Sequence, residues 1–160
     1  MSQIAPVLYG ANFSAQAVTT ATDMFEITPA ADRAVVIYGM SLTQTSDLAD
    51  AAEEILTIGV YRDCTAGSGG TAATEYGYTN AAVSNASAAA VRVLGTASTG
   101  GTLIDIIGWN IRVPLVWVPV PEMRPKFSNL AAEGPVSTFR LISAPADSLT
   151  VSGVLYWAEL

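Results

Sequence analysis

Turn-forming residues interrupt this chain at short intervals along most of its length. Runs rich in Val, Ile, Leu and aromatic residues alternate with clusters of Gly, Pro, Asn, Asp and Ser. Such punctuation is typical of sandwiches and barrels, in which each strand ends at a turn. A recurrent helical pattern between the runs is missing, so parallel βαβ units are disfavoured and two antiparallel sheets bury the apolar stripes most economically. We therefore expect an all-β antiparallel sandwich of the jelly-roll type.

Alternation of apolar and polar residues predicts about eight strands. Within one of them, Val36, Tyr38, Met40 and Leu42 are expected to share a face, because side chains two positions apart point the same way. The run Leu103–Val113 is long enough to need a bend, which is expected near Gly108. The strands are expected at Met24–Thr28, Ala34–Thr45, Leu56–Val60 with Arg62 as its end, Val91–Val93, Leu103–Val113, Leu115–Val118, Phe139–Leu141 and Leu149–Ala158.

One acidic segment, Ser46–Glu54, predicts a short helix between two strands. Ser46 is a suitable N-cap, since its hydroxyl can accept a hydrogen bond from a free backbone N–H of the first turn. Asp47 and Asp50 would lie near the positive end of the helix dipole. The segment is therefore the one helix of the expected fold.

The region Thr65–Thr102 is rich in Gly, Ala, Ser, Thr and Asn and predicts long surface loops around the strand at Val91. Within it, Ala88–Ala90 also suits a helical turn. Residues 21–160 are expected to form the jelly-roll domain, and residues 1–20 an N-terminal arm or a first edge strand. A chain of 160 residues is long enough to bury a core without disulfides.

Charged residues are scarce for a soluble protein of this size. They make up 13% of the chain, and the mean hydropathy is +0.40, whereas about 25% is usual. One interpretation is that partners cover much of the exterior, because large exposed apolar patches mark contact surfaces. The other is a compact domain whose surface consists of Ser, Thr, Asn and Ala.

The charge distribution argues against nucleic acid and membrane partners. The net charge is −7 and the seven basic residues are scattered singly, whereas phosphate backbones require clustered Lys and Arg. The longest apolar stretch, Val113–Pro121, is about half of the ~20 residues that a membrane span needs. The amino terminus also lacks the two features of a signal peptide, a basic first region and a continuous apolar region after it. We therefore expect a soluble protein made in the cytoplasm.

The usual catalytic residues are largely missing. The chain contains no histidine, which removes Ser-His-Asp and Cys-His sites and the His-rich metal sites of many β-barrel enzymes. Cys64 has no histidine to activate it and is expected to be inert. The glycine-rich piece Gly67–Thr71 lacks the lysine of a phosphate loop, and the acidic cluster Asp47–Glu54 lacks the spacing of a calcium loop. We expect no enzyme activity, no cofactor and no bound metal.

Aromatic residues and prolines gather in VPLVWVPVPEMRPKF, where Trp117 and Phe127 lie on a backbone stiffened by four prolines. A rigid extended segment rich in Trp, Met and Arg suits a contact ridge, because such residues are enriched at interfaces and an ordered backbone loses less entropy on docking. Alternatively, the tryptophans, Trp109 among them, fill the core and the prolines cap an edge strand. Both interpretations can hold for different residues. The candidate interface residues, which include apolar positions near the amino terminus, are Ile4, Val7, Leu8, Tyr9, Trp117, Pro121, Met123, Arg124 and Phe127.

Four passages together resemble small jelly-roll decoration (cement) proteins of tailed bacteriophages. They are AADRAVVIYGMSLTQTSD, ILTIGVYRDCTAGSGGTAAT, WVPVPEMRP and APADSLTVSGVLYWAEL, and the resemblance extends over roughly four fifths of the chain, from about Asp23 onward. It implies a virion protein on the outer surface of the capsid, made in the cytoplasm of a host bacterium. The implied partners are the major capsid protein and further copies of the chain, commonly in a trimer. The resemblance carries over no catalytic residue.

Two other functions remain open at the level of sequence. A carbohydrate- or receptor-binding module of a phage tail or fibre would use exposed Trp and Tyr as stacking platforms. A glycosidase would require two carboxylates at a defined separation, for instance Asp105 and Glu122.

Overall fold

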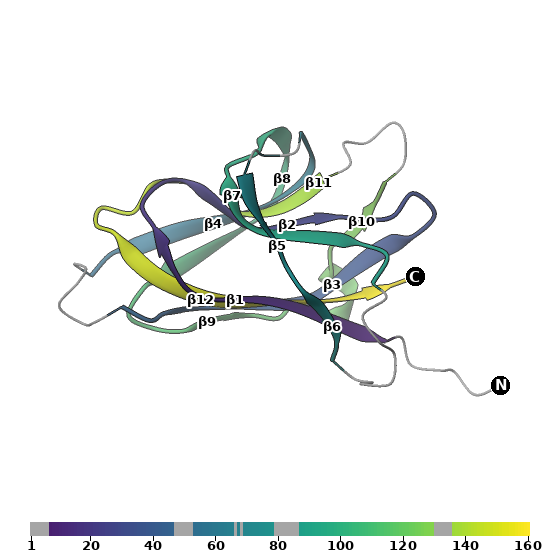
Figure 1. Cartoon of the computed structure of the whole chain (residues 1–160), viewed down its shortest axis with the longest axis horizontal. Helices are drawn as coiled ribbons and strands as arrows, with labels where there is room; N and C mark the ends of the chain where they lie inside the picture. Colours follow the sequence, from purple (N-terminus) through teal and green to yellow (C-terminus); the bar gives the residue numbers. More distant parts are fainter. Residues whose placement is uncertain (1–6, 47–52, 66, 68, 79–86, 130–135) are drawn as a thin grey trace.

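The computed structural model of the chain describes residues 7–46, 53–65, 67, 69–78, 87–129 and 136–160. These ranges contain twelve strands and one 3-10 helix, and the strands form two antiparallel sheets that pack face to face (Figure 1). The expected all-β sandwich is therefore confirmed. In chain order the elements are β1 (Leu8–Val18), β2 (Thr22–Thr28), β3 (Ala34–Gln44), β4 (Ile55–Thr65), β5 (Gly69–Ala72), β6 (Glu75–Gly77), β7 (Ala90–Thr96), β8 (Thr99–Asn110), β9 (Leu115–Trp117), η1 (Pro121–Met123), β10 (Lys126–Ser128), β11 (Val136–Leu141) and β12 (Leu149–Glu159).

The two sheets have six strands each. Sheet A has the order β10-β3-β12-β1-β6, with β9 also paired to β3, and sheet B has the order β5-β7-β2-β11-β4-β8. In Figure 1 sheet A lies along the lower side of the molecule and sheet B along the upper side. The first four strands alternate between the sheets, so each of their connections crosses from one layer to the other.

All eight strands expected from the sequence are present. Their bounds differ most in three cases: β4 continues past Arg62 to Thr65, β7 continues past Val93 to Thr96, and β8 runs from Thr99 to Asn110 instead of from Leu103 to Val113. Three strands were not expected, namely β5, β6 and β10. All three are short, with three or four residues each, so they carry too few alternations to stand out in the sequence.

Strand β1 integrates the amino-terminal part of the chain into sheet A. It pairs with β12 along its length but with β6 only at Tyr9–Ala11, so from Asn12 onward it forms a sheet edge. Residues 8–18 are therefore a strand of sheet A. Residues 1–6, and with them Ile4, lie outside the described residues.

A β-bulge in β3 changes which residues of that strand face the core. Gly39 pairs with Tyr156 of β12 while Ile37 pairs with the next residue, Trp157, so Tyr38 is the extra residue. The buried core face consequently consists of Val35 and Ile37 before the bulge and Met40 and Leu42 after it. The expectation that Val36, Tyr38, Met40 and Leu42 share one face was wrong, because an unpaired residue shifts the alternation by one position.

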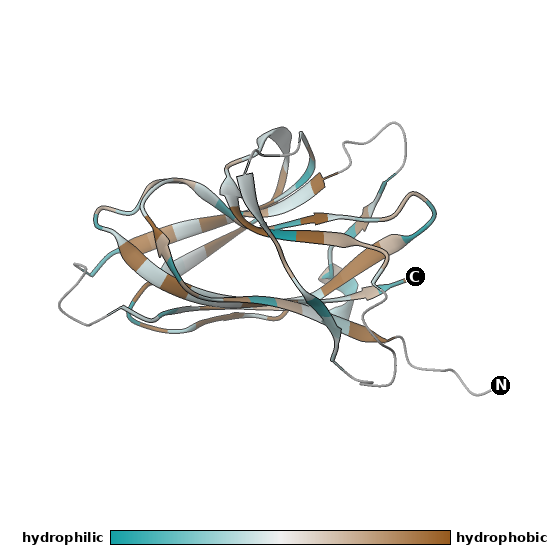
Figure 2. Ribbon diagram, in the orientation of Figure 1, coloured by the Kyte–Doolittle hydropathy of each residue, from teal (hydrophilic) through white to brown (hydrophobic). Residues whose placement is uncertain are grey.

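The core lies between the sheets and is filled from both. In Figure 2 the apolar positions alternate with polar ones along the long strands. Two aromatic pairs connect the layers: Phe13 of β1 with Phe25 of β2 at 5.3 Å between ring centroids, and Trp117 of β9 with Phe139 of β11 at 5.7 Å. Such tilted or edge-to-face pairs stabilise beyond the area they bury, by about 0.5–1.5 kcal/mol.

Two further expectations concern segments outside the strands. Most of the expected helix Ser46–Glu54 falls on residues 47–52, which lie outside the described residues, and Ser46, Glu53 and Glu54 themselves are not helical. The region Thr65–Thr102 was expected to be loops around one strand, but it also contains β5, β6 and the start of β8. At Ala88–Ala90 the chain bends and enters β7, so the helical turn was wrong.

Candidate binding surface

The nine candidate interface residues occupy different environments. Tyr9 and Phe127 are buried in the core, where Tyr9 stacks on Trp157 at 6.1 Å between centroids, so neither offers side-chain surface to a partner. Pro121 and Met123 are exposed in η1. Of the others, Val7, Leu8, Trp117 and Arg124 are half-buried, and Ile4 is not among the described residues. Trp109 is also a core residue, and its indole N–H donates to the carbonyl of Val113 at 2.9 Å.

An apolar ridge, which we define as residues 113–123, contains β9, a strand at one edge of sheet A that lies low in Figure 1. β9 pairs with β3 at Met40–Leu42, and from Leu115 to Val120 half-buried and exposed residues alternate. Prolines at 114, 119 and 121 prevent further ladder pairing, because they lack an N–H. The outward side of a surface segment is ordinarily polar, but here it is apolar. Five apolar residues on it are 55% to 73% exposed, namely Val113, Val116, Val118, Val120 and Met123.

Beside the ridge the outer face of sheet A is hollowed to a volume of about 310 Å³. Val116 and Val118 form the wall on the ridge side, and Gly39 lies in the floor. A Cβ atom at Gly39 would lie 3.0 Å from the carbonyl oxygen of Trp117, so any larger residue there would push against the ridge. The hollow thus depends on a glycine beside the β3 bulge.

Three tyrosines from separate parts of the chain line the hollow. Tyr38 comes from the bulge of β3, Tyr156 from β12, and Tyr78 from the residue after β6, where its N–H donates to the carbonyl of Leu8 at 2.6 Å. The rings of Tyr78 and Tyr156 meet edge to face at 5.0 Å between centroids. Burial raises the pKa of Tyr156 above its ordinary value, and the neighbouring Tyr76 and Tyr78 raise it further. Its hydroxyl is therefore a neutral donor and acceptor near pH 7.

Arg124 provides the positive charge in the hollow. Its guanidinium carbon lies 4.0 Å from the centroid of the Tyr38 ring, in the range of a cation–π contact. Its Nε atom is buried and has no hydrogen-bond partner among the described residues. The ion pairs in the described ranges involve Arg33, Arg62 and Arg140, and none involves Arg124. The hollow therefore combines aromatic walls with one guanidinium that lacks an acidic partner there.

A second exposed apolar surface, which we call the β4–β8 patch, lies on sheet B. Its strand β8 is the edge of the sheet and pairs with β4 alone. The carboxylate of Asp105 accepts a hydrogen bond from the Ile106 N–H at 2.8 Å. This backbone donor is therefore not available for pairing with a strand of another molecule. The exposed members of the β4–β8 patch are Ile55, Leu103, Ile104, Ile106 and Ile142.

Buried ionisable side chains form a network of hydrogen bonds in sheet B. Arg140 donates to Asp23 at 3.0 Å, and the other oxygen of Asp23 accepts from the Ser98 N–H at 2.7 Å. Arg140 also donates to the Ser98 hydroxyl and lies over the ring of Tyr61. Glu26 is buried nearby, and its pKa is raised by burial and by the charge of Asp23. The partners are supplied by the protein itself, so this network holds strands together.

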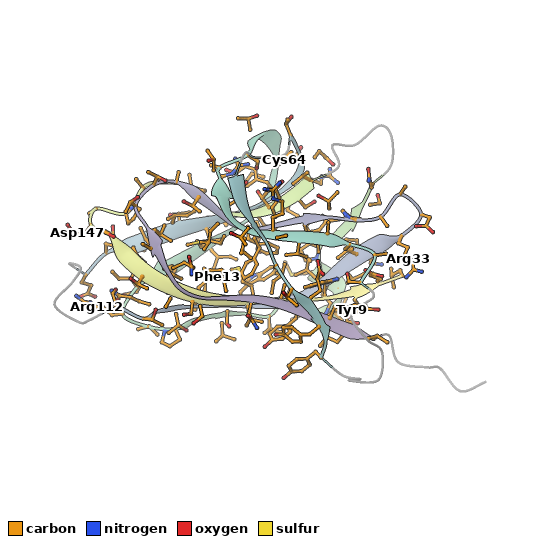
Figure 3. The ribbon with its side chains drawn as sticks, viewed as in Figure 1. Tyr9, Phe13, Arg33, Cys64, Arg112 and Asp147 are labelled. Atoms are coloured by element: carbon orange, nitrogen blue, oxygen red, sulfur yellow. The ribbon has the colours of Figure 1, made fainter. Side chains whose placement is uncertain are left out.

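The remaining candidates for chemistry are separated or enclosed. Cys64 is fully buried at the top of the molecule, well away from Tyr9 on sheet A (Figure 3). Asp105 lies on sheet B, whereas Glu122 lies in η1 between two strands of sheet A. The guanidinium of Arg92 donates hydrogen bonds to the carbonyls of Gly69 and Gly70. In the glycine-rich piece these two acceptors are therefore occupied by a side chain of the protein itself. Among the described residues no cluster of three potential metal ligands occurs.

The sequence signalled this surface only in part. The alternation in LVWVPV indicated two apolar faces, but the hollow needs Tyr38, Tyr78 and Tyr156, which lie far apart in the chain. No family model, no curated protein and no solved structure matches this chain. None of the helices in the described ranges is long and apolar enough to cross a membrane.

Proposed function

We propose that the protein is a structural virion protein that decorates and stabilises the head shell of a tailed bacteriophage. The observation that carries the proposal is the apolar ridge, whose exposed side chains stand on a backbone fixed by three prolines. The part of the ridge outside the hollow, which we call the crest, consists of Val113, Val120 and Met123. Burial of one such side chain contributes about 1.5–3 kcal/mol, and the fixed backbone loses little entropy on docking.

A jelly roll is the finer description of the sandwich that we propose. Four strands of sheet A follow the order β1-β12-β3-β9 and four of sheet B the order β2-β11-β4-β8. Strands from the beginning of the chain thus alternate with strands from its end in both layers, as expected when two Greek keys are rolled together. In this description β5, β6 and β7 are an insertion that widens the sandwich on one side.

The crest is proposed to contact the major capsid protein on the outer surface of the virion. The β4–β8 patch is proposed to contact sister subunits, because a shell protein that is also an oligomer needs two separate contact surfaces. The trimeric state and the bacterial host rest on the resemblance of the sequence passages. Several copies held together would bind the shell more tightly than a single copy, without any additional contact.

Co-sedimentation with heads that lack the protein, taken from the phage that encodes it, tests this proposal. The wild-type chain should saturate the heads at a fixed stoichiometry, and the double variant V120S/M123S should stay in the supernatant. L160S removes an exposed apolar side chain outside the ridge and the β4–β8 patch and should bind as wild type does. Binding of V120S/M123S at wild-type level would show that the crest is not the contact surface. Failure of the wild type to bind would contradict the proposal that the protein binds the head shell.

Light scattering tests the second contact. The wild type should have the mass of an oligomer, and the double variant I55S/I106S should shift towards the mass of a monomer while remaining folded. A monomeric wild type would contradict self-association through the β4–β8 patch.

The alternative function, a carbohydrate- or receptor-binding module of a tail or fibre, is favoured by one observation, the tyrosine-lined hollow. None of the crest residues lines that hollow, so the crest can contact the shell without using the residues of the hollow. The two activities are therefore compatible in one protein and can be measured separately.

A further inference from the structure

We propose that the hollow on sheet A binds an acidic sugar, with the carboxylate of the sugar on Arg124 and its ring against Tyr78. This inference goes beyond shell docking and does not depend on it. The volume of about 310 Å³ is at the lower end of the range of small-molecule sites, which begins at roughly 300 Å³. A site of this size accommodates one sugar ring, with the rest of a chain extending into solvent.

Charge supports an anionic ligand. The protein has 14 acidic and seven basic residues, yet Arg124 has no carboxylate partner in the described part of the chain. The Nε of Arg124 is buried and out of reach of a ligand, so a carboxylate in the hollow would bind the terminal nitrogens of the guanidinium. Because the guanidinium is a planar fork, a carboxylate can satisfy two of its donors at once.

The aromatic side chains that line the hollow favour an anion that carries a sugar ring. Tyr78 is largely exposed, and its edge-to-face contact with Tyr156 holds it at the mouth of the hollow. The apolar C–H face of a sugar packs on such an aromatic ring, as other partly apolar groups do. The hydroxyls of the tyrosines and of Ser41 can exchange hydrogen bonds with sugar hydroxyls, and Tyr156 stays neutral for this purpose.

A peptide strand is disfavoured by the backbone of the floor. Met40–Leu42 of β3 pair with β9 on one side and with β12 on the other. The floor therefore has no free ladder to which an extended peptide could add, although such hydrogen bonds provide most of the affinity in strand addition. Recognition in the hollow must come from side chains, which suits a small, hydroxyl-rich ring.

Calorimetry with matched oligosaccharides on the isolated protein tests the proposal. The two pairs are tetragalacturonic acid with its methyl ester, and 3′-sialyllactose with lactose. At least one acid should bind, and its uncharged counterpart should bind roughly tenfold more weakly or not at all, because it cannot form the charged hydrogen bond with Arg124. Added salt should weaken the binding of the acid. Equal binding of acid and uncharged partner, or no binding of either acid at millimolar concentration, would overturn the proposal.

Variants assign the binding to the hollow. R124Q should weaken acid binding at least about tenfold, whereas R62Q removes the same charge on sheet B and should bind as wild type does. Y78A should lose the ring contact, and Y78F should retain most of the affinity. Unchanged binding by both R124Q and Y78A would move the site elsewhere and overturn the assignment. The crest variant V120S/M123S should still bind the acid, so a failure of shell docking is distinguishable from a failure of this inference.

Discussion

Arg140 of β11 donates its Nε–H to Asp23 of β2 at 3.0 Å, and this ion pair is almost entirely removed from solvent. The same guanidinium lies 4.3 Å over the ring of Tyr61 on β4, so three neighbouring strands of sheet B are joined through one side chain. A charge pair in such a position is sensitive to the loss of either member, since the remaining charge stays buried.

Neutralising one member should destabilise the fold. D23N keeps the shape of the side chain but leaves Arg140 without its counter-charge, and we expect a loss of about 3–5 kcal/mol in the free energy of unfolding. Urea denaturation measures this loss. The control R62Q breaks the exposed pair Arg62–Asp63, found at 3.4 Å, and should change stability by less than about 1 kcal/mol. Equal effects of the two variants would show that the buried network is not a structural element.

Glu26 should make stability depend on pH in an unusual direction for a carboxyl group. Burial and the charge of Asp23 raise its pKa above the ordinary value of 4.5, so the folded state keeps the proton at pH values where the unfolded chain has lost it. The free energy of unfolding should therefore fall as pH rises from that ordinary value through the raised pKa. E26Q should be more stable than wild type near pH 7, and the difference should vanish below the ordinary pKa.

Denaturation of both proteins between pH 4 and pH 8 provides the measurement. E122Q, an exposed position in η1, serves as the control and should follow the wild-type profile. If the stability of E26Q runs parallel to wild type across this range, Glu26 is not the group responsible.

Two glycines of the same strand should respond in opposite ways to alanine. Gly101 has φ +87°, and a Cβ there would clash with Cys64 Sγ, whereas the space around Gly108 is open within 4 Å. G101A should lose at least about 2 kcal/mol through backbone strain and overpacking. G108A should stay within about 1 kcal/mol of wild type. Thermal unfolding of the pair decides, and similar midpoints would contradict the close approach at Gly101.

Cys64 should be unreactive in the native protein. It is fully buried and its thiol lies between the carbonyls of Arg62 and Gly100, each 3.8 Å away. Ellman's reagent should titrate no thiol under native conditions and one thiol in denaturant. Rapid native labelling would mean that the beginning of β8 at Gly100–Gly101 opens readily.

The fold class was predictable because alternation is a local property of each strand. Val151, Leu155 and Trp157, for instance, lie two or four positions apart and are all buried. Bulges are not local in this sense, since the extra residue at Tyr38 is defined only by the pairing of β3 with β12. The inward face of β3 was therefore assigned wrongly at Tyr38, although its position in the chain was correct.

The candidate surface was predictable to a smaller extent. The exposed positions Pro121 and Met123 were identified from the prolines and the residue types around them, but Tyr9 and Phe127 proved to be core residues. The hollow could not be predicted, because Tyr38, Tyr78 and Tyr156 come together only when β3, β6 and β12 occupy the same sheet. A charge without a partner, such as that of Arg124, likewise becomes visible only when the neighbours are known.

The central position of β12 in sheet A has a consequence for biosynthesis. Strand β12 is translated after every other strand of the described residues, yet it lies between β1 and β3, which are among the first of them. While the ribosome is still elongating the chain, these early strands have no ladder partner between them, and folding through such non-local pairings is slow. Sheet A can therefore close only after residues 149–159 have left the exit tunnel, and a nascent chain stalled before that point would expose one unpaired edge on each of β1 and β3 to chaperones and proteases.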